Sequence, residues 1–387
     1  MMARYEFFVK DPGVENAYRS IGYDRNPFRP VADDAARQPL YTGHIKEQLQ
    51  QIQKWAREVN EDRVLQPLSI VGSLGTGKTT ILRVLEAALS AWPPSDKVFV
   101  HSVLLSDTGY ARVSVGAMLI SALERAMESI VGNVPPDVLA IVWAVIQADK
   151  VPGLTTGPLG SAIKKARDVN REQQRALAVD ISQWLRRLPL TPARARESGL
   201  ARPIDWEGEL VGVVAELLTL AHQAGVLKTF FLFVDQIEEL FRPTFSELRR
   251  ARILTDLRSL VDSIDEGAPI GLLLAWAPES DDSLQKKYGA LYARLHRRRV
   301  ELPLLTEQHA GPFAKVWVDA LPGKVSKKGR PELEELVKGA WSRLYQQRQL
   351  MPSAQQQTEP RTLLKALAEE VDERAGVRSP AGGAAAR

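Results

Sequence analysis

The chain has 387 residues, of which 44% are hydrophobic and 25% charged, a balance typical of a globular protein with one large or two ordinary domains. It contains no cysteine, which excludes disulfides, thiolate metal sites and cysteine nucleophiles, and its five histidines show no metal-ligand spacing. The net charge of +4 is compatible with nucleic-acid binding without arguing for it. No apolar run reaches the length of a membrane span and no secretory segment opens the chain, so we expect a cytoplasmic protein without a membrane partner.

The first elements predict the opening of a parallel sheet. Apolar residues at helical spacing follow residue 42, and a short apolar run over 68–71 is typical of a strand. A helix over 81–89 ends before two prolines, and a second strand follows over 98–105. This β-loop-α-β order is the start of a parallel α/β sheet.

Residues 107–228 are too many for an ordinary crossover between two strands. Stretches rich in Gly, Pro and basic residues, over 149–168 and 189–203, are typical of loops. We interpret the middle of this region, about residues 130–205, as a helical insertion, with a scattered set of extra helices as the alternative. The apolar periodicity predicts helices at about 114–131, 136–148, 171–188 and 207–224.

The sheet then resumes with six β-prone residues that run into Asp235. A long helix, an apolar strand and a short strand follow, over 245–264, 270–276 and 300–304. From residue 306 onward the pattern is helical only. The expected fold class is therefore α/β, a P-loop NTPase parallel sheet with a helical insertion and a C-terminal helical lid.

The segment from Gly72 to Thr80 fits the phosphate-loop pattern G-x-x-x-x-G-K-[ST] between a strand and a helix. Its glycines allow backbone N–H groups to surround phosphate oxygens, and the helix that follows aims its positive end at the same anion. Lys78 is expected to reach the β- and γ-phosphates, and the Thr79 hydroxyl to bind Mg²⁺. A glycine-rich turn that matches by chance is the alternative. The candidate nucleotide-binding residues of this loop are Gly72, Ser73, Leu74, Gly75, Thr76, Gly77, Lys78, Thr79 and Thr80.

Asp235 ends an apolar strand, the position where phosphate-loop proteins carry a carboxylate for Mg²⁺. The alternative is an aspartate that caps a turn. Hydrolysis also needs a group that accepts a proton from, or orients, the attacking water. The next residue, Gln236, cannot accept a proton, so we favour Glu238 as the base over Glu239, although both could be solvated carboxylates at the start of a helix.

With these motifs placed, the chain resembles the AAA+ ATPases, in particular the origin-recognition-type initiators and the transposition-associated ATPases. The resemblance implies ATP and Mg²⁺ as cofactors, ATP-bridged self-association, and action on DNA or on a DNA-bound protein. It implies an arginine finger at Arg294, with Arg297 next best, and a sensor arginine at Arg361. It also implies that Phe28 lies near the adenine, while a simple anchoring arm is the alternative there. The family's sensor on the fourth strand falls on Trp276–Ser280, which lacks the usual Asn or Thr.

The resemblance divides the chain into an N-terminal arm over 1–40, an ATPase domain over 41–305, a helical lid over 306–374 and a disordered tail over 375–387. Within the ATPase domain, the insertion of about 130–205 is a candidate surface for a protein partner.

A second resemblance competes with the first. The segment from Asp235 to Phe241 is similar to the Walker B of STAND-type signalling ATPases, which also replace the second acid. It implies an ATP-loaded assembly switch with little turnover.

Basic segments offer candidate contacts to DNA phosphates, with solvated surface charge as the alternative for each. They are Lys286–Lys287, Arg297–Arg299 and Lys324–Arg330.

Overall fold

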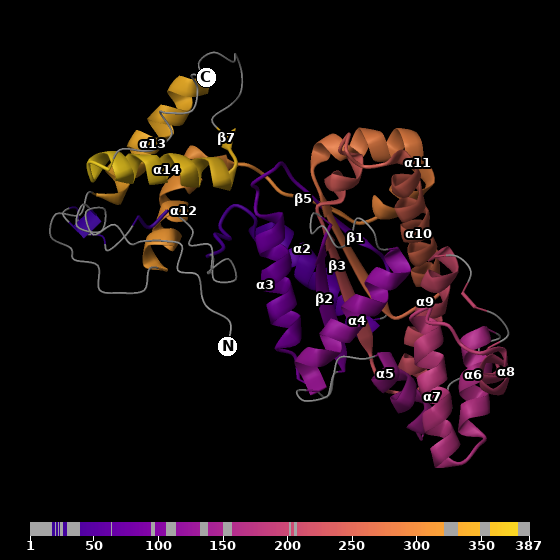
Figure 1. Ribbon diagram of the computed structural model, residues 1–387. Coiled ribbons are helices and arrows are strands. Elements are labelled where there is room, and N and C mark those ends of the chain that lie inside the picture. Colours follow the sequence, from indigo (N-terminus) through magenta and orange to yellow (C-terminus); the bar gives the residue numbers. More distant parts are fainter. Residues whose placement is uncertain are drawn as a thin grey trace. The chain divides into compact units, whose positions relative to one another are not determined.

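The computed structural model in Figure 1 divides into two compact units, which are described separately. The sheet unit comprises residues 47–72 and 81–301, and the lid unit comprises 1–46, 73–80 and 302–387. The structure describes residues 18–19, 21, 23, 26–28, 39–62, 64–93, 97–105, 114–131, 138–149, 157–200, 203–204, 207–320, 332–348 and 357–377.

Five parallel strands form the sheet of the sheet unit, in the order β2-β3-β4-β1-β5. Every residue of β3 and β4 is buried, as expected for apolar runs in a parallel sheet that is covered on both faces. The predicted α/β fold class is confirmed. The strands are β1 (Leu68–Val71), β2 (Val98–Leu104), β3 (Thr229–Asp235), β4 (Ile270–Trp276) and β5 (Arg299–Glu301).

Because the strands are parallel, their carboxyl ends meet at one edge of the sheet. β1 ends at Val71 and β3 ends at Asp235, with β4 between them. The Gly72 amide donates to the Trp276 carbonyl at 3.2 Å, which extends the pairing of β1 and β4 by one residue. Ligands of open α/β sheets bind at this edge, where the order of strands departs from the order of sequence.

Helices cover this sheet and belong to its core. α2 runs straight into η2, a single wide turn in which Asn60 is buried and accepts a hydrogen bond from the Thr229 hydroxyl at 3.2 Å. The helices outside the insertion are α2 (Lys46–Arg57) with η2 (Glu58–Asp62), α3 (Lys78–Ser90), α4 (Val115–Val131), α9 (Glu207–Gln223), α10 (Glu247–Asp265) and α11 (Asp281–Leu295), with short turns η5 (Ile237–Phe241) and η6 (Pro278–Ser280).

The predicted insertion is more helical than the sequence indicated. It consists of α5 (Val138–Gln147), α6 (Pro158–Arg167), α7 (Arg171–Leu185) and α8 (Pro192–Ser198), and its buried residues share one core with α4 and α9. The expected loops over 149–168 and 189–203 were wrong in part, because they contain α6 and α8. Each of these helices starts with a proline at its first position, which favours a helix start but resembles a loop in composition.

The lid unit has three described helices and a two-residue ladder between β6 and β7. Its core includes Tyr18, Tyr23 and Phe28 of the N-terminal arm, and the Asn26 side chain donates to the Ala368 carbonyl at 2.8 Å. Of the short strand expected over 300–304, only residues 300–301 lie in a strand, β5, and β6 begins at Leu305. The elements are β6 (Leu305–Thr306), α12 (Glu307–Asp319), α13 (Leu333–Arg348), β7 (Gln357–Thr358) and α14 (Pro360–Arg374).

The predicted basic segment 324–330 and most of the predicted tail, 378–387, lie outside the described residues. Among the residues that are described, none of the helices is both long and apolar enough to span a membrane.

Candidate nucleotide site

The phosphate loop has the backbone that its glycines predict. Gly75 and Gly77 have φ values of +88° and +97°, in the left-handed region that favours glycine. The Ser73 carbonyl accepts hydrogen bonds from the Thr76 hydroxyl at 2.9 Å and from the Lys78 ammonium at 3.2 Å. Lys78 is only 6% exposed. A buried ammonium is costly unless polar or anionic groups surround it, and phosphate oxygens are such groups.

Arg361 lies next to this loop, and residues 73–80 belong to the same compact unit as Arg361. The Arg361 amide, in the first turn of α14, donates to the Gly75 carbonyl at 3.2 Å. A Cβ atom at Gly75 would lie 2.7 Å from the Arg361 Cβ, so only glycine allows this approach. The structure therefore places next to the loop an arginine that the sequence could assign only by family resemblance. A contact from Arg361 to a γ-phosphate stays a prediction.

Asp235 is 3% exposed at the carboxyl end of β3. Its Oδ1 atom accepts a hydrogen bond from the Gln236 amide at 2.9 Å, and its carbonyl accepts one from Leu105. Gln236 itself has φ +62° and ψ +46°, a left-handed conformation that is uncommon for a residue with a side chain. The Oε1 atom of Gln236 is buried without a hydrogen-bond partner among the described residues.

Glu238 and Glu239 have different environments on η5. The Oε2 atom of Glu238 accepts a hydrogen bond from the Ala277 amide at 3.2 Å. This carboxylate therefore connects the turn after β3 with the turn after β4. Glu239 forms an ion pair with Arg242 at 2.6 Å. Of the two carboxylates, Glu238 contacts the backbone that follows the neighbouring strand.

The basic cluster after α11 is paired with acids. Arg294 bonds to Asp262 at 2.9 Å and Arg297 to Asp265 at 3.2 Å, both on α10. The other two arginines pair with acids as well, Arg298 with Glu58 and Arg299 with Asp281 at 2.7 Å. Sequence reasoning missed this neutralisation because the acids lie far away in the chain. The finger role of Arg294 stays a prediction.

Phe28 is 1% exposed and belongs to the core of the lid unit. Its amide donates to the Asn26 side chain at 3.0 Å, and that side chain also donates to Asp372 at 2.7 Å. These contacts match the anchoring alternative, and proximity to adenine stays a prediction.

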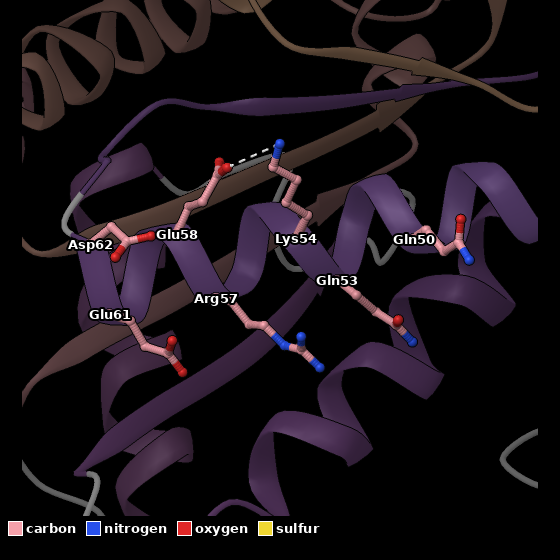
Figure 2. Close-up of a pocket in the computed structure, with 7 residues that line it drawn as sticks. All are labelled: Gln50, Gln53, Lys54, Arg57, Glu58, Glu61 and Asp62. Carbon is pink, nitrogen blue, oxygen red and sulfur yellow. Dashed lines mark ion pairs between the residues drawn. The ribbon is translucent and has the colours of Figure 1, made fainter.

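Figure 2 shows a surface hollow of about 440 Å³ on α2 and η2, with Lys54 and Glu58 paired at 3.7 Å. Its walls mix both charges and contain no nucleophile, and the described residues contain no group of three His, Cys, Asp or Glu that could hold a metal ion. The hollow is therefore no candidate for the chemistry. Its lining residues are Gln50, Gln53, Lys54, Arg57, Glu58, Glu61 and Asp62.

No protein-family model matches the chain, and no curated protein sequence matches it. Among solved structures, the ORC2 protein of Aeropyrum pernix, solved as ADPNP–ADP complexes, matches with 13% identity over 89% of this chain and 71% of that one, at a TM-score of 0.41. Cdc6p of Pyrobaculum aerophilum matches with 14% identity over 83% and 67%, at 0.37. PCH-2 of C. elegans matches with 13% identity over 90% and 74%, at 0.36.

All three matches have identities of 13 to 14% and TM-scores below 0.5, so the ATPase resemblance continues to rest on the sequence motifs.

Proposed function

We propose that this protein binds ATP with Mg²⁺ and hydrolyses it, and that ATP drives its assembly into oligomers that act on DNA or on a DNA-bound protein. The observation that carries the proposal is the phosphate loop, with two left-handed glycines and a buried lysine ahead of a helix start. Backbone N–H groups of such a loop bind phosphate oxygens, and Lys78 supplies the positive charge.

The metal role is assigned by chemistry. Mg²⁺ prefers oxygen ligands, keeps several waters, and is usually held by one or two protein groups together with phosphate oxygens. The Thr79 hydroxyl and the buried Asp235 carboxylate supply such ligands.

Assembly is assigned to Arg294. In the free chain this arginine is paired with Asp262 and is 26% exposed on its side chain. In the proposed oligomer it leaves that carboxylate for the γ-phosphate of a neighbour, a stronger anion that accepts several charge-assisted hydrogen bonds.

The second candidate function is an ATP-loaded assembly switch with little turnover. Two observations favour it: the residue after Asp235 is an amide, and the Glu238 carboxylate is bound to the Ala277 amide. A carboxylate that already accepts a hydrogen bond is a weaker base for water.

The test is ATP hydrolysis by the purified protein with and without duplex DNA, with ATP binding measured separately. We expect Lys78→Ala to lose ATP binding, and Glu238→Gln to keep binding but lose turnover by about 100-fold, the usual contribution of a general base. Lys315→Ala, an exposed lysine of the lid unit, is the matched control for removal of one positive charge.

Tight ATP binding without turnover under any condition would contradict the proposed ATP hydrolysis and support the assembly switch. ATP binding that survives Lys78→Ala would contradict both.

A further inference from the structure

The positive charge of this protein is concentrated in the helical insertion. Residues 157–200 contain nine basic and four acidic residues, a net charge of +5, whereas the whole chain carries +4. The remainder of the chain is therefore slightly acidic. This distribution was not visible in the overall net charge.

Five of these basic side chains are exposed and form no ion pair with the part of the chain that the structure describes. Lys164 and Lys165 end α6, Arg171 and Arg175 begin α7, and Arg196 lies in the last turn of α8. We call these five residues the insertion patch. Three exposed acids, Asp168, Glu172 and Glu197, lie among them and leave the patch net positive.

The fold brings the five residues to one end of the insertion. α6 and α7 are joined by a three-residue turn, so the end of α6 adjoins the start of α7. The Lys165 ammonium donates to the Arg196 carbonyl at 3.0 Å, which brings the end of α8 to the same place. In Figure 1 these three helices form the pink group at the lower right.

Three of the other four basic side chains between residues 157 and 200 bond to groups within the sheet unit. Arg167 donates to the Val145 and Ala148 carbonyls at the end of α5, at 2.9 and 2.7 Å. Arg186 pairs with Glu124, and Arg194 pairs with Asp180. The five patch residues, by contrast, form no ion pair with the described part of the chain, and the printed contacts of Lys165 and Arg196 are to backbone carbonyls.

The basic segments that the sequence singled out for DNA differ in this respect. Lys286 pairs with Asp282 at 3.2 Å and Lys287 with Glu247 at 3.0 Å, and the arginines from Arg294 to Arg299 are paired as described above. A cation that must give up a carboxylate partner before it contacts a phosphate adds little to the free energy of DNA binding. A cation without an ion-pair partner adds more, because its contact releases a counterion from the DNA at no such cost.

We infer that the insertion patch is the surface with which this protein binds the phosphate backbone of duplex DNA. The inference deepens the proposed function and relies on it only for the choice of DNA as the polyanion. The patch offers backbone contacts from lysine and arginine ends and no aromatic platform for unstacked bases, which favours a duplex over a single strand and predicts binding without sequence preference.

The test compares two triple variants that remove the same charge. Lys164→Gln, Lys165→Gln and Arg196→Gln remove three charges of the patch, and Lys54→Gln, Lys286→Gln and Lys287→Gln remove three paired cations as the matched control. Affinity for a fluorescent duplex of unrelated sequence is measured by anisotropy at several salt concentrations, and ATP binding is measured on each protein.

We expect the patch variant to bind the duplex at least about 10-fold more weakly at low salt, with a salt slope about three units shallower, since each lost phosphate contact removes about 0.9. The control should change by less than about 2-fold, and ATP binding should stay unchanged in both.

Equal losses in the two variants, no loss in either, or no duplex binding by the parent protein would each overturn the inference. Equal affinity for polyglutamate would assign the patch to an acidic protein and overturn it as well. If the protein binds ATP but not DNA, only this inference is overturned. If it binds DNA through the patch but does not bind ATP, only the proposed nucleotide function is overturned.

Discussion

Gln236 has three properties that single it out at the carboxyl end of β3. It follows the buried Asp235, it has a left-handed backbone, and its side-chain oxygen is buried without a described partner. A non-glycine residue in this conformation costs roughly 1 kcal/mol, and such strain concentrates at functional sites. The Gln236 amide is therefore held beside the buried Asp235 carboxylate at a cost, and an amide can orient water but cannot remove its proton.

In the switch alternative, where Glu238 does not act as the base, Gln236→Glu should raise the steady-state rate of ATP hydrolysis by about 100-fold, because a carboxylate at this position accepts the proton that the amide cannot. The measurement is phosphate release under saturating ATP with Mg²⁺. Gln236→Asn, which keeps the amide, is the control and should show no gain. An unchanged rate in Gln236→Glu would mean that the side chain is not directed at the attacking water.

At the scale of elements, the segment just before α2 is anchored by contacts between aromatic and histidine rings. The Tyr41 ring stacks on His44 with centroids 5.4 Å apart, and Tyr41 meets Phe313 of α12 edge to face at 6.0 Å. Both ring nitrogens of His44 are buried without a described hydrogen-bond partner. Burial lowers the pKa of His44 to about 4, and the charge of His309 adds to the shift.

The lowered pKa of His44 predicts that acid destabilises the packing of the segment just before α2. The unfolded chain binds this proton near pH 6.5, whereas the folded chain binds it only near pH 4. Between these values the unfolded state binds more protons than the folded state. The contribution of neutral His44 to the free energy of unfolding is therefore fully present above about pH 6.5 and decreases as the pH drops toward 4. Urea unfolding across this range should show the loss, and His44→Phe should reduce its slope. An equal slope in both proteins would assign the acid sensitivity to other groups, such as His101, whose pKa is also lowered by burial.

Elements with strong periodicity were predictable, and those with loop-like composition were not. The strand bounds 68–71 and 270–276 agree with β1 and β4, since apolar runs bounded by glycine or proline allow few alternatives. α6 was missed although Leu159, Ala162, Ile163 and Ala166 have helical spacing, because its ten residues follow a Gly- and Pro-rich stretch. In the site, the loop and Asp235 follow from motifs. The hydrogen bond from Ala277 to Glu238 and the pairing of Arg294 with Asp262 depend on tertiary structure, which local pattern does not encode.

At the scale of the whole molecule, the pairing of Arg294 with Asp262 controls how the proposed assembly responds to mutation. Since the 2.9 Å ion pair competes with any phosphate for the same guanidinium, Asp262→Ala should strengthen ATP-dependent self-association. Arg294→Ala should abolish it and leave ATP binding by the single chain intact. Sedimentation velocity with ATP, ADP and no nucleotide measures both effects. Asp265→Ala, which frees Arg297 instead, is the matched control. Weaker assembly in Asp262→Ala would contradict the finger role.

The concentration of unpaired positive charge on α6, α7 and α8 also affects how the molecule meets its surroundings. A charged end of an otherwise nearly neutral body is turned toward a polyanion while the two are still about one Debye length apart, roughly 10 Å at 0.1 M salt. Encounters with DNA would therefore be oriented before any contact forms, with the insertion as the leading surface. Salt would slow these encounters even where it left the final contacts unchanged.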